Sequence, residues 1–132
     1  MSRERGSSTV EMVLLAPVLA VILGFVSAAG RWGATATAVR SSTDAAARRA
    51  STVARERMRF VAEQHVWERL ERDEERCSRL VTSVMFQDQS APRYVQVTVK
   101  CTVRSDGVLA FLTRGRTISA TSREVIDVFT YR

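Results

Sequence analysis

The sequence predicts an α+β protein, in which an N-terminal transmembrane helix continues or leads into a stem helix packed on a small antiparallel β-sheet. Three observations predict this fold. Met12–Gly30 contains 19 residues without a charge, Asp44–Arg76 repeats apolar residues at helical spacing, and Tyr94–Arg104 alternates apolar and polar side chains. The chain has 132 residues and a net charge of +6. Its length is too short for a nucleotide-binding α/β fold.

The uncharged run has the length of a membrane span. At about 1.5 Å per residue, a helix of 19 residues measures roughly 28 Å, close to the thickness of the hydrocarbon core of a bilayer. The alternative, a buried soluble helix, seldom stays apolar on every side for five turns. Arg3 and Arg5 precede the run, so the positive-inside rule places the N-terminus in the cytoplasm and the rest of the chain outside it. We therefore expect residues 7–30 to form a single-pass transmembrane helix.

A cleaved secretory signal is a second interpretation of the same run. Val26, Ser27 and Ala28 offer small residues at the spacing of a cleavage site. The start of the chain fits a secretory signal less well, because Glu4 dilutes its positive charge and Glu11 adjoins the apolar run. Cleavage near Ala28 would release a secreted, small β-rich protein.

The residues just before the run carry a processing pattern. Gly6 precedes Glu11 by five residues at the head of a hydrophobic helix, which resembles the processing site of type IV prepilins. A carboxylate at the edge of a span is costly and usually has a function. The resemblance implies a leader at residues 1–6, cleavage between Gly6 and Ser7 by an inner-membrane prepilin peptidase, and recognition of Glu11 in processing or assembly. Ser7 and Glu11 stand at i and i+4, so they share one helix face.

The longer string ERGSSTVEMVLLAPVLAVILGF resembles the TadE-like family, the minor pilin or pseudopilin-like proteins of Tad/Flp pili. Pro17 stands inside the span, as in the Leu-x-Pro pattern of that family, and is expected to kink the helix. Met12 departs from the family, in which an aromatic residue is commoner. The resemblance implies an inner-membrane protein of pilus assembly or of a related secretion apparatus. Its partners would be the lipid bilayer, prepilin peptidase, other pilins and pilus assembly platform proteins. An uncut single-span extracytoplasmic binding or regulatory protein is the alternative.

Residues 31–43 are expected to form an interface or linker segment, with Trp32 at the level of the lipid headgroups. Within it, Ala34–Thr43 either continues the helix as a close-packing surface or loosens into a linker. Ser41–Asp44 offers helix N-caps, which predicts that an amphipathic stem helix begins there and extends over 44–76. Its apolar stripe consists of Val53, Ala54, Met58, Val61, Ala62, Val66 and Leu70. Eight arginines and eight acidic residues balance each other between Asp44 and Arg76. The stem helix therefore offers no basic surface for a phosphate backbone, and no nucleic acid partner is expected.

Residues 77–132 are expected to form the small antiparallel sheet module. The sequence predicts strands at Leu80–Phe86, Tyr94–Arg104 and Thr117–Tyr131. Ser105–Gly107 reads as a turn, and Val108–Leu112 as an apolar loop or short helix.

The chain offers little material for catalysis or metal binding. Cys77 and Cys101 have neither a CxxC spacing nor a neighbouring histidine, so a zinc site is not expected. Outside the cytoplasm they could form one disulfide, worth about 3 kcal/mol, and two buried free thiols are the alternative. The only histidine, His65, is expected to be an inert residue on the surface of the stem helix. We expect no enzymatic activity, no cofactor, no metal and no small-molecule substrate.

Overall fold

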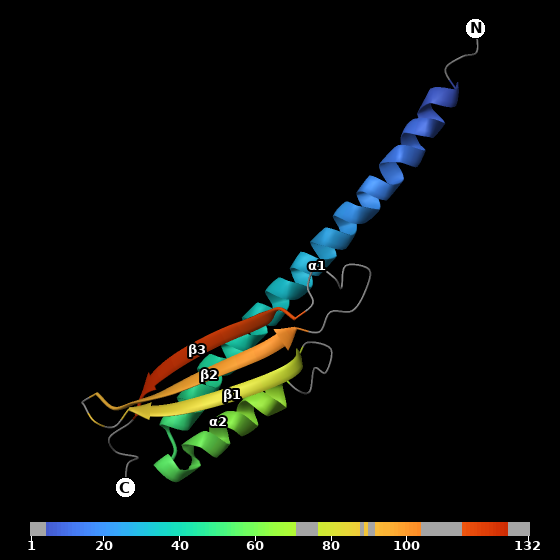
Figure 1. The fold of residues 1–132 in the computed structure, drawn as a ribbon. Coiled ribbons are helices and arrows are strands. Elements are labelled where there is room, and N and C mark those ends of the chain that lie inside the picture. The colour runs from blue at the N-terminus through green and yellow to red at the C-terminus, as the bar shows by residue number, and fades with distance from the viewer. Residues whose placement is uncertain (1–4, 71–76, 88, 90–91, 104–114, 127–132) are drawn as a thin grey trace. The chain divides into compact units, whose positions relative to one another are not determined.

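The structure is a computed structural model that describes residues 5–70, 77–87, 89, 92–103 and 115–126. Figure 1 shows its elements, which follow the chain in the order α1 (Arg5–Ser51), α2 (Arg55–Leu70), β1 (Cys77–Gln87), β2 (Tyr94–Val103) and β3 (Thr117–Val125). The predicted α+β class with a long N-terminal helix and an antiparallel sheet is confirmed. The chain divides into two compact units, Met1–Gly33 and Ala34–Arg132.

The first unit contains the N-terminal part of α1. Its large apolar side chains are exposed, from Met12 at 74% to Ile22 at 51%. An apolar surface of this kind on every side of a helix is typical of a segment that is solvated by lipid rather than by water.

In the described part of the second unit, three antiparallel strands pair in the order β1-β2-β3. Val97 of β2 lies opposite Val84 of β1 and Ser122 of β3, which fixes the register of both pairings. The inner face of the sheet holds much of the core and includes Val84, Val95, Val97, Val99, Cys101 and Ile118. The alternation predicted for Tyr94–Arg104 therefore places its apolar side on the core, as expected for a sheet with one buried face.

The strand ends differ from the sequence-based expectation. β1 begins at Cys77, three residues before Leu80, and a bulge lies between Cys77 and Arg79. β3 ends at Val125, where the next backbone N–H, that of Ile126, donates to the carbonyl of Arg93 at 2.9 Å. The predicted turn at residues 105–107, the apolar loop at 108–112 and the end of the last strand at 127–131 lie outside the described residues.

Within this unit, α2 and the C-terminal part of α1 lie on one side of the sheet (Figure 1). The buried positions of α1 in the second unit carry mostly small side chains, namely Thr35, Val39, Ser42, Thr43, Ala46, Ala47, Ala50 and Ser51. They recur at steps of three and four and form one stripe. The predicted stripe of α2 is buried at Met58, Ala62, Val66 and Leu70.

Of the two alternatives for residues 31–43, the structure has the continuing helix and not the linker, because these residues are helical throughout and belong to α1. The expected N-caps do not start a new helix. The hydroxyls of Ser41, Ser42 and Thr43 donate to backbone carbonyls one turn earlier, at 3.1, 3.0 and 2.6 Å. Serine and threonine satisfy their hydroxyls in this way inside helices as well as at caps, so the same residues are compatible with both structures.

The expectation of one unbroken stem helix over 44–76 is also wrong, because α1 ends at Ser51 and α2 begins at Arg55. The hydroxyls of Ser51 and Thr52 donate to carbonyls in the last turn of α1, at 2.8 and 3.0 Å. Arginines in the last turn of α1 and Glu56 in the first turn of α2 suit the two helix dipoles. Residues 71–76 of the expected helix lie outside the described residues.

Candidate processing site and membrane segment

The structure places the predicted processing residues on one helix. Gly6, Ser7 and Glu11 all lie in α1, which begins at Arg5. The helical backbone puts positions 7 and 11 one turn apart on the same face. The side chain of Glu11 is exposed. A carboxylate therefore stands one turn after the backbone amide that would become the free amine if the chain were cut after Gly6.

The apolar helix begins directly after this carboxylate. An 18-residue window of α1 near the N-terminus has a mean hydropathy of 2.5 and no buried residue, so it qualifies by length and composition as a membrane span. A methyl group added to the backbone at Gly30 or Gly33 would meet no atom within 4 Å. Pro17 lies inside α1, with helix on both sides, and the kink expected there stays a prediction.

The two cysteines are joined in the structure. The Sγ atoms of Cys77 and Cys101 are 2.03 Å apart, and the bond links the beginning of β1 to β2. The Cys101 side chain is completely buried in the inner face of the sheet. The bond closes a loop with a sequence separation of 24 residues, for which chain entropy gives a stabilisation of about 3 kcal/mol.

The expectation that His65 lies on a helix surface is wrong, because its side chain is only 5% exposed. Among the described residues, neither Nδ1 nor Nε2 of His65 has a hydrogen-bond partner. Burial is the main cause that lowers the pKa of His65 below 6.5; Arg49 of α1 and Arg69 lower it further, and Glu68 opposes them. His65 follows the buried Ala62 by one turn, and this spacing was the signal in the sequence for its burial.

We expect the stability of the second unit to fall as the pH is lowered below about 6.5, because the unfolded histidine takes up a proton that the folded one resists. His65→Leu should remove this dependence and raise the free energy of unfolding by about 1–2 kcal/mol at neutral pH, since it removes two unsatisfied ring nitrogens. Urea unfolding of the full chain in detergent, followed by pulse proteolysis at pH 5.5 and 7.5, measures both effects. If the free energy of unfolding depended on pH equally in the wild-type and His65→Leu chains, His65 would not be the cause of the pH dependence.

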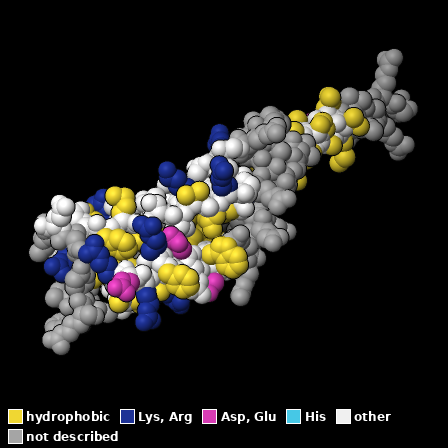
Figure 2. All heavy atoms as spheres, turned by 60° about the horizontal axis from the view of Figure 1, so that its bottom comes forward, with side chains coloured by type: hydrophobic (Ala, Val, Ile, Leu, Met, Phe, Trp, Pro, Cys, Tyr) yellow, Lys and Arg dark blue, Asp and Glu magenta, His cyan; other side chains and the backbone are white. Residues whose placement is uncertain are grey.

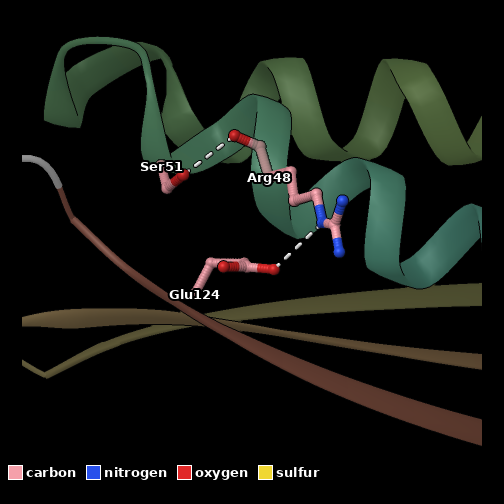
Figure 3. A network of polar contacts seen from close by, with 3 residues as sticks. All are labelled: Arg48, Ser51 and Glu124. Carbon is pink, nitrogen blue, oxygen red and sulfur yellow. Dashed lines mark hydrogen bonds and ion pairs between the residues drawn. The ribbon is translucent and has the colours of Figure 1, made fainter.

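One ion pair, between α1 and β3, was not predicted from the sequence. Arg48 Nε lies 3.3 Å from Glu124 Oε1, and the Ser51 hydroxyl donates to the Arg48 carbonyl (Figure 3). The Arg48 side chain is 77% exposed, so the pair is worth less than about 1 kcal/mol. Among the described residues, no group of three or more histidine, cysteine or acidic side chains could hold a metal ion.

Comparison with known families finds a match in the N-terminal third of the chain. Residues 6–48 match the family model described as TadE-like protein. This confirms the resemblance, and the matched segment contains Gly6, Glu11, Pro17 and the whole apolar run. The TadE-like match supports a function related to the Tad pilus, and together with the apolar helix it fits a single-pass membrane protein. No curated protein and no solved structure matches the chain.

Proposed function

We propose that the chain is a membrane-anchored TadE-like minor pilin or pseudopilin that takes part in assembly of a Tad/Flp-type pilus or a related secretion apparatus. One observation carries the proposal: Gly6 and Glu11 lie at the head of an exposed apolar helix, inside the TadE-like match. In this account the helix is held in the inner membrane with its N-terminus in the cytoplasm, and the second unit lies outside the cytoplasm. Arg3 and Arg5 support this orientation.

Cleavage after Gly6 gives Glu11 its proposed role. It leaves Ser7 with a new α-amino group, which is cationic at neutral pH because its usual pKa is about 7.7–8.0. A carboxylate and an ammonium group each carry a large cost in lipid, which falls when they pair. Glu11 of one subunit would therefore pair with the amine of a neighbouring subunit and set the register of the two helices.

The proposed partners follow from this role. They are the lipid bilayer, prepilin peptidase, other pilins and pilus assembly platform proteins. We propose no catalytic activity, cofactor, small-molecule substrate or nucleic acid partner.

The sharpest test of the processing step is Gly6→Ala, because a methyl group at this position would obstruct a peptidase that fits closely around the backbone. We expect the variant to keep its first six residues when the full chain is co-expressed with prepilin peptidase. Gly30→Ala is the matched control: its added methyl group meets no atom within 4 Å, so its cleavage should be as complete as that of the wild-type chain. The readout is the mass of the purified chain.

Two outcomes would overturn the proposal. Equal cleavage of the Gly6→Ala and wild-type chains at residue 6 would remove the role of the glycine. A wild-type chain that stays uncut with an active peptidase would instead support the single-span extracytoplasmic binding or regulatory protein.

A further inference from the structure

The outer face of the sheet, the side turned away from the helices, is basic. Register with β2 places three cationic side chains on it, namely Arg79, Lys100 and Arg123, and all three are exposed. None of the described side chains on this face is acidic. Its other described members are uncharged and include Val81, Met85, Tyr94, Gln96 and Val125.

This face also exposes apolar side chains and holds one cation in place. Val81, Met85 and Val125 are 48%, 62% and 61% exposed. Arg123 Nε donates to Gln96 Oε1 at 2.7 Å, and its guanidinium carbon lies 5.6 Å from the centre of the Tyr94 ring. A fixed cation beside apolar side chains loses little conformational entropy when it meets a carboxylate.

The outer face of α2 carries a small net negative charge and two exposed aromatic rings. Phe60 and Trp67 stand seven residues apart on the side opposite the buried stripe, and they are 65% and 59% exposed. The exposed polar side chains around these two rings are Glu56, Arg57, Arg59, Glu63, Gln64 and Glu68, which include three acids and two bases. Figure 2 shows hydrophobic side chains at the surface beside acidic and basic ones.

The two faces point in opposite directions within the second unit. α2 covers the inner side of the sheet through Met58, Ala62 and Val66, so its aromatic side points away from the sheet. The basic face of the sheet points away from α2. One unit therefore cannot bring its own two faces together, whereas two copies can.

We propose that the outer face of α2 of one copy docks on the outer face of the sheet of a second copy of this chain. Charge complementarity favours a second copy of this chain as the partner. Acidic side chains beside two exposed aromatic rings on α2 would meet cations beside three exposed apolar side chains on the sheet. The spacing of the side chains on the two faces agrees as well. Phe60 and Trp67 are about 10 Å apart along the helix, and Met85 and Arg123 are about 10 Å apart across three strands.

This contact is heterologous: each copy offers one face to the copy before it and the other to the copy after it. Such contacts propagate into a row unless their rotation closes a ring. The association uses only the second unit and does not depend on the proposed role in a pilus. It also does not require cleavage after Gly6.

The experiment is site-specific photo-crosslinking of the full chain in proteoliposomes. A benzophenone amino acid replaces Trp67 in unlabelled chains, which are mixed with ¹⁵N-labelled chains. We expect mixed-isotope crosslinks from position 67 to the outer face of the labelled sheet. The same probe at Thr52, an exposed residue outside both faces, should give none of them. Crosslinks to lipid alone, or within one chain alone, would overturn the proposal.

Charge reversal tests the complementarity. Arg79→Glu/Lys100→Glu makes the sheet face acidic, and Glu56→Arg/Glu63→Arg makes the α2 face basic. We expect each double variant alone to lose about ten-fold in crosslinking yield. With the probe on the α2 variant and the label on the sheet variant, mixing the two should restore the yield. Protection of both variants from protease shows that they are folded. Failure of the folded mixture to regain crosslinking, or undiminished crosslinking in either variant alone, would overturn the proposal.

Discussion

Replacement of Glu11 by alanine is expected to leave cleavage after Gly6 intact and to weaken subunit association by about 100-fold. The reason is that the amine of the neighbouring subunit would lose its partner in lipid, at a cost of about 3 kcal/mol for each broken pair. The measurement is the number of pili per cell, together with the amount of the chain recovered with other pilins, in cells that carry the complete assembly system. Intact mass on the same sample shows whether cleavage occurred.

Two further variants separate charge from shape at this position. Glu11→Gln keeps the size of the side chain and removes its charge, so it should fail as Glu11→Ala does. Glu11→Asp keeps the charge and should retain part of the association. Normal assembly of the cleaved Glu11→Gln chain would show that pairing with the amine is not required.

Reduction of the bond between Cys77 and Cys101 is expected to lower the free energy of unfolding of the second unit by about 3 kcal/mol, because the open chain regains the entropy of a loop with a 24-residue separation. Urea titration of the full chain in detergent with pulse proteolysis, with and without reductant, gives the difference. Reduction removes no side-chain atom, so it avoids the cavity that a substitution of buried Cys101 would create.

The matched control for this experiment is Cys77→Ala/Cys101→Ala, whose unfolding midpoint should not respond to reductant. A wild-type midpoint that is equally unresponsive would contradict a stabilising bond. Two free thiols titrated in the native, unreduced chain would contradict the bond itself.

The strands and the long apolar helix could be predicted from the sequence because their patterns are local. The strict alternation from Tyr94 to Val103 leaves one register for a sheet with one buried face, and β2 has that register. The uncharged run is long and apolar enough to cross a bilayer, so its helix could be predicted from the sequence alone. Gly6 and Glu11 could also be predicted from the sequence, because their spacing of five residues at the head of that run is a local pattern.

The helix ends and the environment of His65 depend on contacts that are distant in sequence. Ser41–Thr43 can cap a helix or bond within one, and only the packing of Ser42 and Thr43 in the core decides between them. His65 is buried because α2 lies on the sheet, which the helix pattern alone does not establish. The aromatic pair on the outer face of α2 has helical spacing too, but spacing does not show which side faces water.

The N-terminus of the wild-type chain tests the central claim most directly. The chain should be purified from the membranes of cells that make its own prepilin peptidase, and its mass and first residue determined by mass spectrometry. We predict a chain that begins at Ser7 and keeps the apolar helix from Met12 to Gly30. A chain that still carries Gly6 and the residues before it, or one that begins near Ala29 without that helix, would contradict the claim.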